Sequence, residues 1–156
     1  MLTGKKIVLG VSGGIAAYKM ANVASMLSKL HADIHVVMTE NATHFITPET
    51  FEVLTGNHCY TDTFDRCMEL HVPHIALGTQ ADAILIAPAS ADVVGKIANG
   101  IADDMLTTCV LPATCPVMLA PSMNVHMYEN PIVQDNMKKL VSYGYEIIEA
   151  DDGYFA

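Results

Sequence analysis

Four short segments of the sequence carry small, hydroxyl or amide residues, which can present several hydrogen-bond donors to one ligand. They are Gly10–Gly14, Thr39–Asn41, Pro88–Ala91 and Pro121–Asn124, and each follows an apolar run. Three of them lead directly into a predicted helix, whose first backbone N–H groups lack acceptors within the helix. One such segment is typical of an ordinary turn, whereas four that converge predict a pocket for a phosphate or a planar polar ring.

The glycine segment matches neither common nucleotide fingerprint, because it is not G-x-G-x-x-G and no lysine follows it as in a P-loop. The chain has 8 Lys and Arg against 17 Asp and Glu, a net charge of −9, and Arg66 is its only arginine. This balance argues against nucleic-acid binding, which needs clustered cations. A bound phosphate must therefore be held by neutral groups, and a mononucleotide held through Ser12 and backbone amides is the better fit.

Few side chains in the sequence can act as an acid or a base. His71 and His74 are spaced i, i+3, but a proline intervenes and no third metal ligand is evident, so we expect no metal site. Either histidine could instead be a surface or packing residue, and the same holds for His126. Met123 and Met127 flank His126 and are possible exceptions to the usual role of methionine as core filler. So few reactive groups indicate that a cofactor performs the difficult chemistry.

Alternating apolar segments predict the scaffold that positions these residues. Buried strands are expected at Ile7–Val11, Ile34–Met38, Ala83–Ala87, Pro116–Ala120 and Glu146–Glu149. Helices are expected over Ala16–Leu30, over Ala91–Ala98 after the N-cap Ser90, after Asp103 and Asp104, and from Asn130 to Gly144. The pattern predicts an α/β fold with a doubly wound, Rossmann-like parallel sheet. Ligands bind such sheets beyond the carboxyl ends of the strands, where the four polar segments lie.

The length of 156 residues fits one domain, residues 1–156. Only 16% of the residues are charged where about 25% is typical, and the mean hydropathy is +0.32, so we expect a homo-oligomer that buries much of its exterior. The four cysteines show no C-x-x-C spacing, which favours a reduced, cytoplasmic protein. Residues 105–128 carry no formal charge, but Pro112, Pro116 and Pro121 interrupt them, so no membrane span is expected.

Five motifs together resemble the homo-oligomeric flavin-containing cysteine decarboxylase family. They are Gly10-x-Ser12-Gly13-Gly14, His74-Ile75, Ala87-Pro88-Ala89-Ser90-Ala91, Gly100-Ile-Ala-Asp-Asp104 and Pro121-x-Met123-Asn124-x-x-Met127. The Pro-x-Met-Asn-x-x-Met element and the His-Ile pair are specific to the family, whereas the glycine loop is shared with many folds. The resemblance extends over nearly the whole chain.

The resemblance implies roles for individual residues. The FMN-binding residues would be Gly10, Ser12, Gly13, Thr39, Phe45, Pro88, Ala89, Ser90 and Asp104. His74 would be the active-site base, and Asn124 would hold the carboxylate of the substrate, with Met123 and Met127 beside it. Members of the family assemble as trimers or dodecamers with FMN at a subunit interface, which agrees with the low charge content.

The implied reaction is the decarboxylation of 4′-phosphopantothenoylcysteine to 4′-phosphopantetheine in coenzyme A biosynthesis. Loss of CO₂ from a cysteine carboxylate leaves a carbanion that a saturated side chain cannot delocalise. Oxidation of the CH₂–SH group to a thioaldehyde places a C=S bond β to the carboxylate and supplies the electron sink. Decarboxylation then gives an enethiol, and its reduction restores the oxidation state, so there is no net redox change.

The sequence departs from the family at a few positions. Ser122 and Tyr128 replace a usual alanine and tryptophan, and both changes are mild. Relatives that perform the final reduction have a Cys-Gly segment on a flap after the last strand, whereas this sequence ends at residues 151–156, where the flap should begin. We expect either a truncated flap or a missing reduction step.

Three alternatives stay open from the sequence. A peptidyl-cysteine decarboxylase of lantibiotic synthesis makes the enethiol and needs no flap cysteine. A non-catalytic flavin-binding regulatory subunit would be expected to carry long acidic tails, which this sequence lacks. A flavin prenyltransferase shares the glycine loop but should lack the Pro-x-Met-Asn element.

Overall fold

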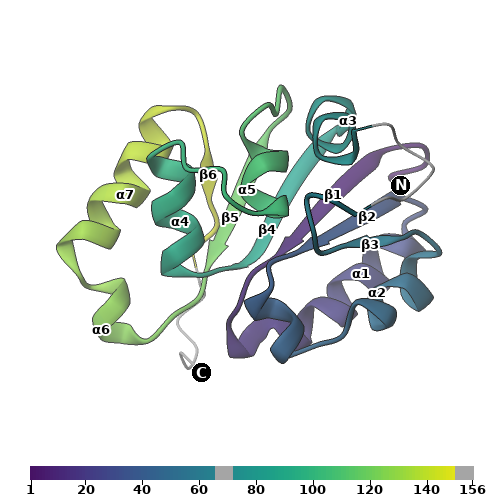
Figure 1. Cartoon of the computed structure of the whole chain (residues 1–156), viewed down its shortest axis with the longest axis horizontal. Coiled ribbons are helices and arrows are strands. Elements are labelled where there is room, and N and C mark those ends of the chain that lie inside the picture. The colour runs from purple at the N-terminus through teal and green to yellow at the C-terminus, as the bar shows by residue number, and fades with distance from the viewer. Residues whose placement is uncertain (66–71, 150–156) are drawn as a thin grey trace.

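A computed structural model describes residues 1–65 and 72–149 of the chain. Its centre is one sheet of six parallel strands in the order β3-β2-β1-β4-β5-β6 (Figure 1). The strands are Lys6–Val11 (β1), Asp33–Met38 (β2), Cys59–Tyr60 (β3), Ala83–Ala89 (β4), Val117–Pro121 (β5) and Glu146–Ile147 (β6). The long central strands are the continuous apolar runs of the sequence, as expected for strands buried on both faces. The predicted doubly wound fold is confirmed.

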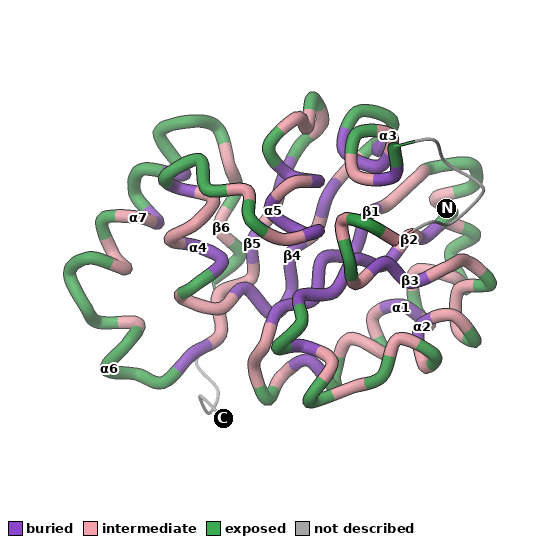
Figure 2. Tube along the Cα trace, viewed as in Figure 1, coloured by how far each residue is buried: buried purple, intermediate pink, exposed green. Residues whose placement is uncertain are grey.

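Helices cover both faces of the sheet and enclose two apolar cores (Figures 1 and 2). One face carries Ile15–Lys19 (η1), Met20–Lys29 (α1), Asn41–His44 (η2) and Pro48–Thr55 (α2), where η denotes a 3₁₀-helix. The other face carries Pro73–Gln80 (α3), Ala91–Ala98 (α4), Met105–Val110 (α5) and Pro131–Ser142 (α7). Val125–Tyr128 (α6) is a single turn after β5. None of the helices in the described ranges combines the length and the apolar character that crossing a membrane needs.

The sequence patterns indicate neither β3 nor the helices α2 and α3. β3 is too short to show a period, and α3 has a weakly amphipathic pattern. α2 does carry standard end signals, because Pro48 is its first residue and Gly56 follows it in the left-handed conformation. The predicted helix over Ala16–Leu30 is divided into η1 and α1, and the last strand ends at Ile147.

The order of the strands places a topological switch point between β1 and β4. The chain leaves β1 toward the α1 face and leaves β4 toward the α4 face, so the connections diverge at the carboxyl ends of these two neighbouring strands. Such a switch point is where open parallel sheets bind ligands. The Ser12 and Ser90 segments follow these two strands directly.

One part of the sheet is covered on a single face. In the described part of the chain, the core under α1 and α2 includes no residue of β5 or β6. Met118 and Ala120 alternate with the core residues of β5 and are partly exposed, and the side chain of Ile148 is 44% exposed. Parallel sheets of this class are normally covered on both faces. Among the described residues, an apolar strip of the sheet is thus left uncovered on this face.

Gly78 sits where α3 crosses α5, and its replacement should destabilise the fold. A Cβ atom there would lie 2.3 Å from the carbonyl oxygen of Cys109, which is backbone and cannot move aside. We expect Gly78→Ala to lower the free energy of unfolding by roughly 3 kcal/mol. Gly95→Ala in α4 is the matched control, because its Cβ would meet only Asn136 Nδ2 at 3.5 Å. Helix propensity should make the control more stable by about 0.5–1 kcal/mol. Urea unfolding measures the free energy of unfolding of both variants. Equal changes in the two variants would contradict the proposed clash at Gly78.

Candidate active site

The polar segments after β1, β2, β4 and β5 meet at one edge of the sheet. The backbone N–H of Ser122 donates to the carbonyl of Ala89 at 3.1 Å, which joins the ends of β5 and β4. A Cβ atom on Gly13 would lie 2.4 Å from the Cβ of Asn41, so the ends of β1 and β2 are also in contact. The convergence predicted from the four segments is confirmed.

Ser12 joins the β1 and β4 loops through its side chain. Its hydroxyl donates to the carbonyl of Pro88 at 2.5 Å and accepts from the N–H of Ser90 at 2.9 Å. The residue is fully buried, with 0% of its surface exposed. The hydroxyl predicted to hold a phosphate is therefore used within the protein. Its role in this structure is to fix the position of Ser90 at the start of α4.

At two of the predicted cofactor-binding glycines, close packing within the protein explains why the residue is glycine. A Cβ atom on Gly10 would lie 2.5 Å from Cδ1 of Leu106, so this glycine lets α5 approach β1. Gly13 lets the β2 loop approach in the same way. At Gly14 the nearest atom, Cγ of Pro88, is 3.8 Å away, so only this glycine of the loop leaves ordinary space beside its backbone.

Capped helix ends supply the donors at this edge. Ser90 is the N-cap of α4 and accepts from the N–H of Val93 at 3.3 Å. Thr39 is buried and accepts from the N–H of Ala42 at 3.2 Å at the start of η2, whereas Phe45 beyond η2 is 45% exposed. The first N–H groups of α4 and η1 have no intrahelical acceptors, so they are available to a ligand.

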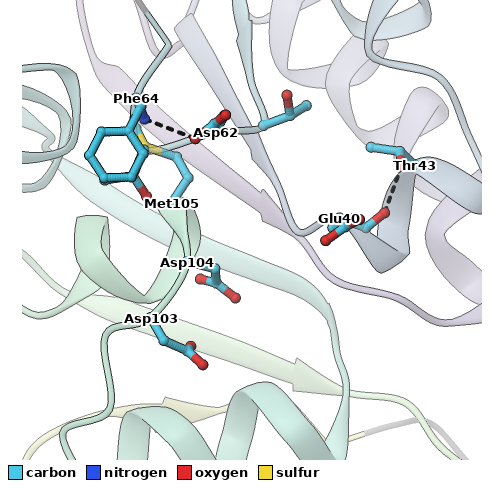
Figure 3. Close-up of a pocket in the computed structure, with 9 residues that line it drawn as sticks. Glu40, Thr43, Asp62, Phe64, Asp103, Asp104 and Met105 are labelled. Atoms are coloured by element: carbon cyan, nitrogen blue, oxygen red, sulfur yellow. Dashed lines mark hydrogen bonds between the residues drawn. The ribbon is translucent and has the colours of Figure 1, made fainter.

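An acidic cleft of about 480 Å³ adjoins these loops (Figure 3). Its wall includes the carboxylates of Glu40, Asp62, Asp103 and Asp104, and Phe64 at its rim is 86% exposed. Four carboxylates repel an anion, so the phosphate of a ligand cannot lie on this side. In the described part of the chain, the Gly14 and Ser90 ends of the site lack such a group of carboxylates and are better suited to a phosphate.

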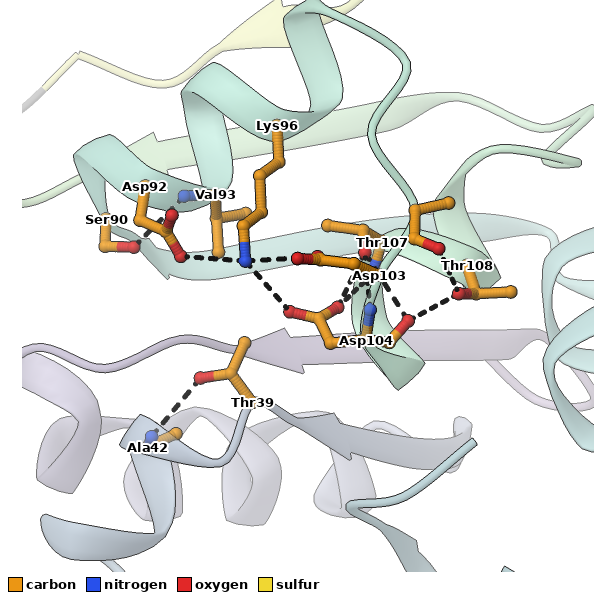
Figure 4. Close-up of polar contacts among 11 residues, drawn as sticks. Thr39, Ala42, Ser90, Asp92, Val93, Lys96, Asp103, Asp104, Thr107 and Thr108 are labelled. Carbon is orange, nitrogen blue, oxygen red and sulfur yellow. Dashed lines mark hydrogen bonds and ion pairs between the residues drawn. The ribbon is translucent and has the colours of Figure 1, made fainter. Parts of the chain in front are cut away.

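Asp104, a predicted cofactor-binding residue, is held by the protein on both carboxylate oxygens. Oδ1 accepts from the backbone N–H and from the hydroxyl of Thr107, each at 2.7 Å, in a capping box that starts α5. Oδ2 lies 3.9 Å from Nζ of Lys96 (Figure 4). Its carboxylate is therefore positioned firmly at the edge of the cleft.

Asn124 presents a free amide group at the end of β5. It is the N-cap of α6, and its Oδ1 accepts from the N–H of His126 at 2.9 Å. The Nδ2 group has no acceptor among the described residues, and the residue is exposed. Met123 is buried and Met127 is 48% exposed. This segment thus offers an N–H₂ donor to a carboxylate, with an apolar side chain close by.

His74 lies far from Asn124 within one chain. It is the second residue of α3, and Figure 1 shows α3 and α6 at opposite sides of the molecule. Its Nδ1 atom is buried and has no hydrogen-bond partner among the described residues. A buried polar atom without a partner is costly unless a ligand or another chain supplies one. His71 lies outside the described residues.

The sequence analysis missed Lys96, which the structure places among three carboxylates. The spacing of Asp92 and Lys96, four residues apart on one helix, is a signal that could have identified the pair. The approach of Asp103 depends on the loop after α4 and could not be read from spacing.

Comparisons with known proteins place the chain among flavoproteins. A model of the Flavoprotein family matches residues 1–154. The chain is 49% identical to the coenzyme A biosynthesis bifunctional protein CoaBC of Bacillus subtilis over all 156 residues but spans only 38% of that protein. It is 43% identical to the probable phosphopantothenoylcysteine decarboxylase of Streptococcus mutans over 97% of this chain and 86% of the other.

Solved structures show the same fold. The FMN-dependent cysteine decarboxylase SpaF superposes with a TM-score of 0.90 at 37% identity, over 98% of this chain and 88% of SpaF. A mutant PPC decarboxylase complexed with pantothenoylaminoethenethiol gives 0.80 at 30% identity, over 92% of this chain and 81% of the other. The resemblance indicated by the five sequence motifs is confirmed, and the chain belongs to the flavoprotein family.

Proposed function

We propose that this chain uses FMN to decarboxylate 4′-phosphopantothenoylcysteine to 4′-phosphopantetheine in coenzyme A biosynthesis. The names of the Bacillus and Streptococcus relatives support this substrate. The observation that carries the proposal is the convergence of the polar segments after β1, β2, β4 and β5 at one sheet edge. The last of these segments ends in the free amide of Asn124.

The residues at this edge fit FMN. Its phosphate needs several donors, and the first N–H groups of α4 and η1 would hold it without cations. The β1/β4 switch point is the place where sheets of this kind bind a flat ring system. When bound, FMN supplies a reversible two-electron oxidation of the carbon that bears the substrate's sulfur. Ser12, Thr39 and Ser90 set the positions of the loops that would contact it.

Asn124 would bind the substrate's carboxylate, and His74 would act as the base. The Nδ2 group of Asn124 donates to the substrate's carboxylate and orients it, while the neutral amide neither gives up nor takes a proton at working pH. His74 has a buried Nδ1 atom without a partner among the described residues, and its imidazole would act as the base beside the substrate. Since no described residue satisfies this nitrogen, it is open to a bound ligand or to another copy of the chain.

We propose that the enzyme is a homo-oligomer, a trimer or a dodecamer, with the active site between copies. His74 and Asn124 lie on opposite sides of one chain, so a substrate can reach both only where α3 of one copy meets α6 of another. The strip of β5 and β6 that is open on one face gives a second copy an apolar surface to cover. A contact between different faces of identical chains closes into a ring when its rotation is an exact fraction of a turn, as in a trimer.

The cysteines support a cytoplasmic location. Cys59, Cys109 and Cys115 are free thiols in the described residues. Burial raises the pKa of Cys59 and of Cys109 to about 12, so both thiols stay protonated and unreactive. A fold that uses such thiols as apolar packing groups is suited to a reducing compartment.

Mass spectrometry of the product tests the proposed function. Purified protein is supplied with FMN and phosphopantothenoylcysteine, and in parallel with a peptide that ends in cysteine, because the fit to SpaF favours cysteine decarboxylation more broadly. We expect loss of CO₂ from phosphopantothenoylcysteine, giving the saturated thiol or the enethiol that is lighter by two hydrogens. Turnover of the peptide alone would identify a peptidyl-cysteine decarboxylase. FMN binding without turnover of either would identify a regulatory subunit.

A further inference from the structure

The turn that follows Asn124 is too short to hold itself in place. α6 comprises only the four residues Val125–Tyr128, and none of them is buried. A single turn of helix is unstable in isolation, because it fixes several dihedral angles in return for few hydrogen bonds. The orientation of α6 therefore depends on its contacts with the rest of the protein.

Gln134 ties the end of α6 to the helix that follows it (Figure 1). Its Nε2 group donates to the backbone carbonyl of Tyr128 at 2.7 Å, and both residues are partly buried. The last carbonyls of a helix find no donor within the helix, so a side chain can satisfy one of them. α7 is a helix of 12 residues whose Met137 and Leu140 lie in the core. The bond thus joins a short turn to a firmly packed element.

The same turn fixes the direction of the Asn124 amide. Oδ1 of Asn124 accepts from the backbone N–H of His126 at 2.9 Å, and its backbone carbonyl accepts from the N–H of Tyr128 at 3.0 Å. Any rotation of α6 therefore carries the Nδ2 group of Asn124 with it. A binding group loses much of its effect when it is displaced by about 1 Å, so the supporting contacts matter as much as the group itself.

Close packing does not replace the Gln134 bond at the junction of α6 and α7. A cavity of about 270 Å³ lies between α6, α7 and β6, and its wall includes Tyr128, Gln134 and Ile147. Among the residues that the structure describes, this side of the junction is thus loosely filled, and van der Waals contacts stabilise it less than they would a core. The hydrogen bond from Gln134 is correspondingly more important for the position of α6.

We propose that Gln134 is a positioning residue, which holds α6 so that the amide of Asn124 faces the carboxylate of the substrate. Gln134 need not touch the substrate, because it acts through the carbonyl of Tyr128 and the α6 turn. This inference rests on the proposed function, in which Asn124 binds that carboxylate.

A comparison of substrate with product tests the inference, because 4′-phosphopantetheine lacks the carboxylate that Asn124 would bind. The value of kcat/KM for 4′-phosphopantothenoylcysteine and the inhibition constant of 4′-phosphopantetheine are measured for the wild type and for Gln134→Met. Methionine has a similar length and helix propensity but no N–H donor. We expect kcat/KM to fall about tenfold and the inhibition constant to stay unchanged. Equal changes in both would indicate a general disturbance of the site and would overturn the inference.

Two further variants separate the hydrogen bond from other effects. Gln134→Glu keeps the size and helix propensity of the side chain, but a carboxylate has no N–H to donate, so this variant should lose activity as Gln134→Met does. It also replaces Gln134→Met in the test if that variant does not fold. Lys139→Met is the matched control, because it breaks a side-chain bond from α7 to Asn99 at the end of α4. The control should keep the wild-type kcat/KM, and a fall as large as that of Gln134→Met would contradict the role of Gln134.

A double variant shows whether Gln134 acts through Asn124. Asn124→Ser keeps an N-cap for α6 but removes the amide, so adding Gln134→Met should change the remaining kcat/KM by less than about twofold. A further tenfold fall would show that Gln134 acts elsewhere. Wild-type protein without decarboxylase activity would overturn the proposed function together with the inference, whereas full activity of Gln134→Met would overturn the inference alone.

Discussion

Asn124→Asp should abolish decarboxylation while the fold and FMN binding remain intact. Aspartate is as good an N-cap as asparagine, so its Oδ1 still accepts from the N–H of His126 and α6 still forms. The change replaces the Nδ2 donor with a second negative charge that faces the substrate's carboxylate. Loss of such a donor alone costs about 100-fold in rate, and the repulsion adds to it. We therefore expect kcat/KM to fall by at least about 100-fold.

Asn130→Asp is the matched control for this variant. Asn130 caps α7 with the same geometry, because its Oδ1 accepts from the N–H of Ile132 at 2.9 Å and the residue is exposed. Both variants therefore add one negative charge at a capped helix start. Activity, flavin absorbance and thermal unfolding are compared for the two. Equal activity of Asn124→Asp and Asn130→Asp would remove Asn124 from substrate binding.

The scaffold and the location of the site could be predicted from the sequence because each depends on local patterns. Strands buried on both faces must be apolar throughout, which makes segments such as Ile34–Met38 visible without any structure. Parallel connection then places the residues after each strand at a common edge. This rule predicts that Asn124 and Ser90 lie at that edge, and the family resemblance predicts their roles.

The hydrogen-bond partners and packing neighbours of individual side chains could not be predicted, because they are residues distant in sequence. Ser12 looked available to a phosphate, but its hydroxyl is used between Pro88 and Ser90, which are 76 and 78 positions away. The sequence predicts that Gly10 belongs to a ligand-binding loop. In the structure, the side chain of Leu106 packs so close to Gly10 that there is no room for a Cβ atom. The spacing of residues along the sequence shows which of them reach an edge of the sheet. It does not show whether their donors and acceptors are already paired within the protein.

The separation of His74 from Asn124 could not be predicted from the sequence either. The sequence places both in one predicted site, and nothing in the spacing of α3 and α6 says that they lie on opposite sides of the chain. If both residues act on one substrate, the open strip of β5 and β6 and the low charge content have the same explanation. In that case, the copies must meet for the proposed chemistry to occur.

A mixture of two inactive variants should therefore regain activity. We expect His74→Asn and Asn124→Asp each to bind FMN and fail to decarboxylate. When the two chains are co-expressed with different tags and mixed oligomers are isolated, some interfaces combine an intact His74 with an intact Asn124. Random assembly of equal amounts makes about a quarter of the sites complete, so activity should return to about a quarter of the wild-type value.

The double variant His74→Asn/Asn124→Asp, co-expressed with wild-type chains, provides the opposite arm of this test. If one site needs both residues from the same chain, about half of the sites remain active, whereas a site shared between copies leaves about a quarter. Shared sites thus predict equal activities for the two mixtures. A site within one chain predicts about half for this mixture and only the residual activity of the single variants for the other. That second pattern would show that His74 and Asn124 do not meet across an interface.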